Sequence, residues 1–397
     1  MRLGKAHMRW HNYEALKAVY LQYNATPPYQ QATYANNEDD ALSFPFRAYV
    51  MFYIDMYDIS NDTTWLDLAF DSVDHVLDNT DKRRSEKGEI TVTAKTDPIT
   101  AGNYYQGAYP YVKDGTPLLG WSSTDGSPSP YLRGQVLQDG QILGYISSLV
   151  DYVKDNAITA YITRADDYIT FMKTVIDIHA PSWRDGYFKT VDGVPIWVQG
   201  TYLYQNVDGQ GSLYSSPLAY NHSGGLMQAM LVCHKYEIGG IASYLDKATK
   251  FIGFIRDTRQ DVEDRFFFQY ILTSPTAEDL NHGSYYIVPF IKFAYDNGYL
   301  GVTIDEVESY SNSLAYAWRL DKVGSVAERF DGTSANETTG IPDGEAFDVG
   351  QMAMLGEFNN DIYSMCRDLL GTRYIANYAR QYWGYSSMLR FIPDNIR

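Results

Sequence analysis

A repeated helical pattern constrains the fold of this chain more than any other feature of its sequence. Three segments can be aligned on an alanine, at Ala69, Ala165 and Ala248. Each segment begins with an aromatic residue four positions earlier and continues with apolar residues at helical spacing, which is typical of an amphipathic helix. The three copies are 65–70, 161–166 and 244–249, and a looser fourth copy covers 302–318.

A more apolar and less charged helical segment precedes each copy. These segments lie at about 40–58, 136–153, 222–237 and 280–297; a further pair lies at 346–358 and 361–380, and 9–23 closes the set. Buried and half-exposed helices that alternate in this way are typical of repeated helical hairpins. The sequence therefore predicts an all-α fold, a complete or incomplete six-hairpin (α/α) toroid in one domain over 1–397. An irregular helical bundle is the alternative.

Two connections are too long for simple turns between helices. Residues 84–134 are rich in Gly, Pro, Ser, Thr and Tyr and contain short β-like runs, and 183–220 are rich in aromatic residues. Long connections in compact domains are usually functional or disordered, and the aromatic content argues against disorder. Both lead into a buried helix, so we expect short β insertions on one rim of the toroid and a functional site there.

An Asn-His pair occurs twice, at 221–222 and 281–282, and each pair opens an apolar helical stretch. A helix start has unpaired N–H groups and the positive end of the dipole, which disfavour an imidazolium ion. A neutral imidazole at this position can accept a proton. The alternative is that Asn221 and Asn281 are helix caps and that His222 and His282 are packing groups.

Charge and composition limit the classes of partner. The chain has 49 acidic and 32 basic residues and a net charge of -17, so nucleic acid and anionic membranes are poor partners. Only two cysteines are present, without metal-ligand spacing, and no apolar run is long enough for a membrane span. The first thirty residues contain no signal-peptide core, so a secreted or periplasmic location requires that a signal was removed.

The two Asn-His motifs, with Glu278-Asp279 before the second and Tyr285-Tyr286 after it, resemble the helical-toroid polysaccharide lyases that act on uronic acid polymers such as alginate and glucuronan. The resemblance covers most of the chain as architecture but only these short motifs as chemistry. It implies β-elimination on an acidic polysaccharide without a cofactor or a metal.

The resemblance also implies roles for the residues of the motifs. Asn221 would neutralise the uronate carboxylate, and one such hydrogen-bond donor is worth roughly 3–4 kcal/mol. His222 or His282 would be the base, and Tyr285 or Tyr286 the acid or an acid–base pair. Tyr285 lies three and Tyr286 four residues after His282, so either can share its helix face. The family's arginine near the tyrosines has no clear counterpart here.

Further residues in the two connections are candidates for substrate binding. Arg133 and Arg184, with Lys189 nearby, can offset the charge of an acidic substrate, and the tryptophans can stack on sugars or anchor the connections. Asp139-Gly140-Gln141, at the start of a buried helix, can add a carboxylate or a sugar contact. The substrate-binding set is Arg133, Arg184, Trp121, Trp183, Trp197, Asp185, Asn281 and Glu278.

Two alternatives to the lyase remain open. A toroid glycoside hydrolase would pair Asp185 with Glu278 or Asp279, one as acid and the other activating water. In the purely structural alternative, Asp279 caps a helix and Glu278 is a solvated surface charge. A non-catalytic glycan-binding toroid is the other alternative. No phosphate-binding glycine loop, zinc motif or nucleophile elbow occurs in the sequence.

Overall fold

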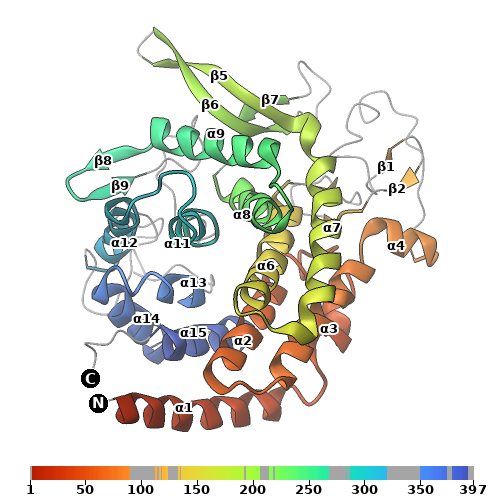
Figure 1. The fold of residues 1–397 in the computed structure, drawn as a ribbon, viewed down its shortest axis with the longest axis vertical. Coiled ribbons are helices and arrows are strands. Elements are labelled where there is room, and N and C mark those ends of the chain that lie inside the picture. Colours follow the sequence, from red (N-terminus) through yellow and green to blue (C-terminus); the bar gives the residue numbers. More distant parts are fainter. Residues whose placement is uncertain are drawn as a thin grey trace. The chain divides into compact units, whose positions relative to one another are not determined.

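Helices dominate the described part of the chain, and the strands lie in the connections between them (Figure 1). The predicted all-α class, with strands only as insertions between helices, is confirmed for the described residues. The computed structural model describes residues 2–89, 112–113, 116–117, 119–123, 133–134, 136–191, 194–205, 214–217, 220–267, 283, 287–319, 349–372 and 378–391.

The chain forms two compact units. Unit 1 contains Met1–Gln31, Pro45–Ser72 and Arg259–Arg397, and unit 2 contains Ala32–Phe44 and Val73–Thr258. The sequence predicts one domain over 1–397, which stays a prediction.

Two helical hairpins form the centre of unit 2, namely α6 with α7 and α8 with α9. Their bounds are Val136–Asp155 for α6, Ile162–Ile178 for α7, Tyr220–Tyr236 for α8 and Ala242–Thr258 for α9. Among the described residues, the other helical elements of this unit are the 3₁₀ turns Ala32–Tyr34, Thr159–Tyr161 and Ala180–Ser182, the end of α3 (Thr64–Asp78) and α4 (Asp81–Glu86).

The two buried helices of unit 2 are parallel and pack with almost no space between them. Gly140 of α6 lies against the start of α8, and Ser148, two turns further along α6, accepts a hydrogen bond from Gln228 of α8. A β-carbon on Gly225 would lie 2.1 Å from the carbonyl oxygen of Gly140, so a glycine is needed there. Because the helices run in the same direction, their amino-terminal ends lie side by side.

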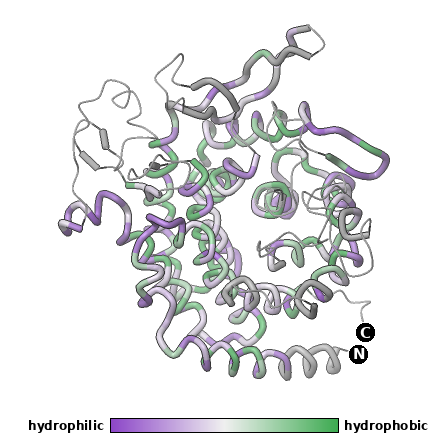
Figure 2. Tube along the Cα trace, turned by 180° about the vertical axis from the view of Figure 1, so that it is seen from behind, coloured by the Kyte–Doolittle hydropathy of each residue, from purple (hydrophilic) through white to green (hydrophobic). Residues whose placement is uncertain are grey.

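The helices that carry the repeated pattern are amphipathic, as predicted. Ala69, Ala165 and Ala248, on which the copies align, each have 0% exposed surface. The small side chain lets each helix approach its neighbour, while charged residues remain on the outer face. Figure 2 shows that most helices carry both hydrophobic and hydrophilic residues.

The connection over 183–220 contains a longer sheet than the short β insertions that the sequence predicts. Strand β5 (Trp183–Val191) pairs antiparallel with β6 (Val194–Gln205), from Trp183 opposite Tyr202 to Val191 opposite Val194. Strand β7 (Tyr214–Pro217) pairs with the end of β6. Asp-Gly at 192–193 is a strong hairpin signal that the sequence interpretation missed. In the connection over 84–134, the described residues form four two-residue strands, β1 (Val112–Lys113), β2 (Thr116–Pro117), β3 (Ser122–Ser123) and β4 (Arg133–Gly134).

Unit 1 is organised around an aromatic core and a buried carboxylate. Tyr20 and Tyr53 share a hydrogen bond of 2.6 Å between their hydroxyls within this core. Asp55 has 0% exposed surface and accepts hydrogen bonds from Ser386, Ser387 and Arg390. Burial raises the pKa of Asp55, and Arg390 opposes that shift.

The helices of unit 1 match most of the predicted segments. Those that the structure describes are α1 (Arg2–Tyr23), α2 (Pro45–Ser60), the start of α3, α11 (Phe293–Asp296), α12 (Ile304–Arg319), α13 (Val349–Ala353), α14 (Asn360–Thr372) and α15 (Tyr378–Arg390). Unit 1 also contains the 3₁₀ turn Pro28–Gln30, the π-helical segment Ile287–Lys292 and strands β8 (Gln260–Val262) and β9 (Arg265–Phe267). Among the described residues, no helix has the length and apolar character needed to cross a membrane.

The close packing of α6 and α8 predicts that Gly225→Ala destabilises the protein, although alanine is normally the better helix former. The new β-carbon would overlap the backbone of Gly140, and we expect a loss of about 1–3 kcal/mol in the free energy of unfolding. Gly140→Ala is the matched control, because its β-carbon would stop 3.3 Å from the nearest atoms of α8. Denaturant unfolding should rank Gly225→Ala as the more damaging change, and equal stability would contradict the packing described.

Candidate functional site

The amino-terminal end of α6 lies against a polar turn that belongs to the same unit. In this turn, Asn37 accepts hydrogen bonds through its side-chain oxygen from the backbone N–H groups of Leu42 and Ser43. Asp40 has a left-handed backbone, with a φ of 57°, which is uncommon outside glycine. Its Oδ1 accepts a hydrogen bond from Nε2 of Gln138 at 3.3 Å, which holds the half-buried carboxylate at the first turn of α6.

The start of α8 contributes polar atoms without a protein partner. Asn221 is 1% exposed and Ser223 is 0% exposed, yet both amide atoms of Asn221 and the hydroxyl of Ser223 lack hydrogen-bond partners within the described structure. Gln141, one turn along α6 from Gln138, donates to the carbonyl oxygen of Asn221 at 3.4 Å. Buried polar groups are nearly always paired, and a ligand hydroxyl or an ordered water is one kind of partner that such atoms can take.

A buried carboxylate fixes the connection that precedes α6. Oδ1 of Asp139 accepts a hydrogen bond from the backbone N–H of Trp121 at 3.0 Å, and Oδ2 lies 2.7 Å from Nε2 of His179. The side chains of Asp139 and His179 are both 0% exposed. Asp139 therefore joins α6, the end of α7 and residue 121, and its two oxygens are engaged with protein groups.

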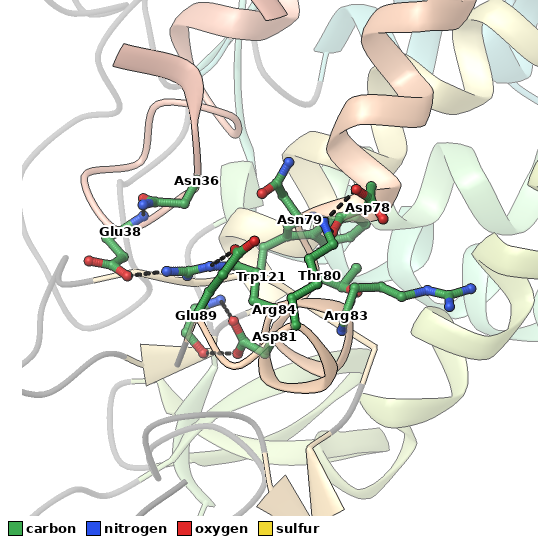
Figure 3. Close-up of polar contacts among 12 residues, drawn as sticks. Asn36, Glu38, Asp78, Asn79, Thr80, Asp81, Arg83, Arg84, Glu89 and Trp121 are labelled. Carbon is green, nitrogen blue, oxygen red and sulfur yellow. Dashed lines mark hydrogen bonds and ion pairs between the residues drawn. The ribbon is translucent and has the colours of Figure 1, made fainter. Parts of the chain in front are cut away.

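A second polar cluster supports the same connection from the side of α4. Asp81 accepts hydrogen bonds from Ser122, and the indole N–H of Trp121 donates to the carbonyl of Val76 at 2.8 Å. Figure 3 shows Arg84 pointing toward Glu38, with which it forms an ion pair. These contacts position the connection and the polar turn on unit 2.

The structure brings some of the predicted site residues together. Asn221 and His222 both lie in the first turn of α8, next to Gly140 and Gln141 of α6, and His222 is only 7% exposed. The motif Asp139-Gly140-Gln141 thus adjoins the first Asn-His pair, because the buried helices α6 and α8 begin side by side.

Asp185 and Arg184 lie on β5 and have other partners. Asp185 forms an ion pair with Lys250 of α9 at 2.9 Å, and its carboxylate is 70% exposed. Hydrogen bonds from Lys250 and Trp183 lower the pKa of Asp185. The guanidinium of Arg184 donates to the carbonyl of Trp183 at 2.8 Å.

The three predicted tryptophans differ in exposure. Trp121 is 0% exposed and Trp183 is 9% exposed, packed edge-on against Tyr202, which fits the alternative that these two anchor their connections. Trp197 is 50% exposed, and its ring lies edge-on to Phe188 across the hairpin.

Several predicted residues lie outside the described part of the chain, so their proposed roles stay predictions. These are Glu278, Asp279, Asn281, His282, Tyr285 and Tyr286, together with the side chains of Arg133 and Lys189. Within the described ranges, no group of three or more His, Cys, Asp or Glu side chains is arranged to hold a metal ion.

The sequence interpretation missed Asp40, Gln138 and His179. A signal for Asp40 was present, because the acidic run 38–40 stands directly before an apolar helix. Gln138 adjoins the Asp139 motif that was singled out. His179 follows an outer helix and has no sequence motif, so only the fold reveals its contact with Asp139.

Comparisons with known proteins identify solved structures but no family. No family model matches the chain, and no curated protein matches it. An inactive variant of the α-1,6-mannanase GH76A of Salegentibacter sp. HEL1_6, in complex with α-1,6-mannotriose, is 12% identical over 98% of both chains, with a TM-score of 0.49. Another inactive variant, with α-1,6-mannotetrose, is 14% identical over 88% of both chains, with a TM-score of 0.44. The structure of the GH76A α-1,6-mannanase from Salegentibacter sp. HEL1_6 is 13% identical over 87% of this chain and 88% of that chain, with a TM-score of 0.44.

These findings correct the predicted identity. The similar structures are glycoside hydrolases, so the resemblance to uronic acid lyases, the predicted β-elimination and the assignment to alginate or glucuronan are wrong. The physical reason is that two short Asn-His motifs on a widely used helical fold do not specify a reaction.

The contacts of Asp139 predict that Asp139→Ala destabilises the protein. The substitution leaves the N–H of Trp121 and the buried imidazole of His179 without their acceptor, and we expect a loss of roughly 2–4 kcal/mol in the free energy of unfolding. Thermal and denaturant unfolding measure this loss. Asp185→Asn is the control, because an exposed ion pair contributes only about 0–1 kcal/mol. Similar stabilities for the two variants would show that Asp139 does not hold the connection.

Proposed function

We propose that this protein is a glycoside hydrolase that acts on a neutral glycan. The site is the cluster formed by the polar turn and the amino-terminal ends of α6 and α8. The observation that carries the proposal is the set of buried, unpaired atoms of Asn221 and Ser223 beside Gln138 and Gln141.

The chemistry of these atoms favours a hydroxyl-rich ligand. The Asn221 amide offers a donor and an acceptor, and the Ser223 hydroxyl offers both in one group. An anion would satisfy only the donors, and Asp40 would repel it. A sugar hydroxyl both donates and accepts, so it matches the whole set directly or through an ordered water.

The charge of the protein supports an uncharged substrate. With a net charge of -17, the protein repels polyanions at long range. A neutral glycan meets no such repulsion, and its binding requires none of the arginines that an acidic polymer would need.

Hydrolysis of a glycosidic bond requires two carboxyl groups, one to protonate the leaving oxygen and the other to act as base or nucleophile. Asp40 is a suitable candidate because it is half-buried and held by Gln138 at the site. The adjacent Asp39 is exposed and is our candidate for the second group. Asp139 is less suitable because protein groups engage both of its oxygens.

The first test is the release of reducing ends from a panel of neutral glycans that includes α-mannans, with alginate as an acidic comparison. We expect activity on a neutral member and no unsaturated product from alginate. Asp40→Asn removes the proton transfer of this carboxyl group and should lower turnover about 10²–10⁴-fold.

Asp185→Asn is the matched control, because it tests the carboxylate pair that the sequence suggested. If Asp185→Asn abolishes turnover and Asp40→Asn does not, the proposed site is wrong. If the wild-type protein binds a neutral glycan without cleaving any member of the panel, the chain is a binding toroid rather than an enzyme.

A second test separates stability from function at Asn221. Asn221→Leu replaces unpaired buried polar atoms with an apolar group of similar size, which should leave the melting temperature unchanged or raise it. The same change removes ligand contacts, so glycan affinity should fall about tenfold or more. Calorimetry and a binding assay measure the two effects.

Asn79→Leu provides the contrast, because Asn79 is also buried but donates to the carbonyl of His75 at 2.8 Å. This variant should lose stability. A loss of stability in Asn221→Leu similar to that in Asn79→Leu would indicate that Asn221 has a structural partner.

A further inference from the structure

The hairpin of β5 and β6 carries two exposed aromatic rings. Phe188 is 69% exposed and Trp197 is 50% exposed, although both are large apolar side chains. They occupy directly paired positions, and their ring centroids are 5.0 Å apart at an interplanar angle of 69°. Pro195, two residues from Trp197 on the same strand, points to the same face by strand alternation and is also exposed.

This surface is separate from the anchored end of the hairpin. At the base, Trp183 and Tyr202 pack together and are buried, and a β-carbon on Gly253 of α9 would meet the side chain of Gln199 at 2.6 Å. Toward the turn, the hairpin projects beyond the helices of unit 2 (Figure 1). The exposed pair therefore lies on the part of the hairpin that extends away from its support.

We propose that Phe188 and Trp197 form an accessory platform that holds a neutral glycan chain. A pyranose ring has an apolar face of C–H groups, and a fixed aromatic ring offers a flat apolar surface of similar size. The edge-on contact with Phe188 fixes the Trp197 ring across the strands, so little side-chain freedom is lost when a sugar binds.

The exposed area favours a sugar over a protein partner. Two aromatic rings with these exposures present roughly 200 Å² of surface. A stable protein interface needs about 800 Å² from each partner, whereas one or two sugar rings can be covered by this pair. A neutral chain also avoids repulsion from the acidic protein. The inference rests on the proposed function for the class of ligand, because it extends glycan binding to a second surface.

The experiment measures binding independently of hydrolysis. Asp40→Asn protein is applied to an array of immobilised neutral mannans, glucans, galactans and xylans, with alginate for comparison. Trp197→Val is then added to this background, because valine retains the strand preference but removes the ring. We expect retention on the best polymer to weaken roughly fivefold to tenfold, and Trp197→Tyr to restore most of it.

Two controls separate binding from structure. Tyr385→Ala removes another exposed aromatic ring, from α15 of unit 1, and should leave retention unchanged. Limited proteolysis should cut the hairpin of Trp197→Val no faster than that of the parent. Faster cleavage with unchanged retention would show that the pair only stabilises the hairpin, and would overturn the proposal.

The remaining outcomes distinguish this inference from the proposed function. If the wild-type protein hydrolyses no glycan but ring-dependent retention persists, the hydrolase proposal fails and the platform stands. If hydrolysis occurs but Trp197→Val protein binds the immobilised polymer as strongly as its parent does, the proposed platform is wrong. Concentration-dependent self-association that disappears in Trp197→Val would also overturn it, in favour of a second copy of this chain.

Discussion

The contact between α6 and α8 is the constraint on which the rest of unit 2 depends. Gly140, Gly144 and Gly225 remove side chains from the interface, so the two backbones approach within van der Waals contact. Parallel packing at this distance places both helix starts side by side. The polar residues in the first turn of each helix then lie close to backbone N–H groups that have no partner within the helix.

Much of the helical architecture could be predicted because the repeated pattern reflects packing. The aligned alanines are buried, and the apolar segments at 136–153 and 222–237 became α6 and α8 with small shifts at their ends. Such patterns are local, since helical spacing alone sets which residues share a face. The hairpin after α7 was harder to recognise because aromatic residues over 183–220 suit loops and strands alike, and the Asp-Gly signal at 192–193 was missed.

The candidate site could be predicted only in part. Asn221 and His222 were recognised from a motif at a helix start, and they do lie beside the Asp139 motif. Asp40 and His179 reach the same region through turns and helix ends that are distant in sequence, and no spacing rule connects them. The error in the reaction had another cause: an asparagine and a histidine at a helix start serve many chemistries, and the acidic character of the chain had already argued against a polyanion.

The order of the segments in unit 1 has a consequence for biosynthesis. Both segments of unit 2 lie before Arg259, whereas unit 1 combines two early segments, Met1–Gln31 and Pro45–Ser72, with one that begins at Arg259. Asp55 meets Ser386, Ser387 and Arg390 only after the last of these has left the ribosome. A nascent chain can thus complete the unit with the proposed site while α2 still lacks its partner α15. Until α15 is made, Asp55 and the aromatic side chains of the unit 1 core stay exposed to solvent, where chaperones can bind them.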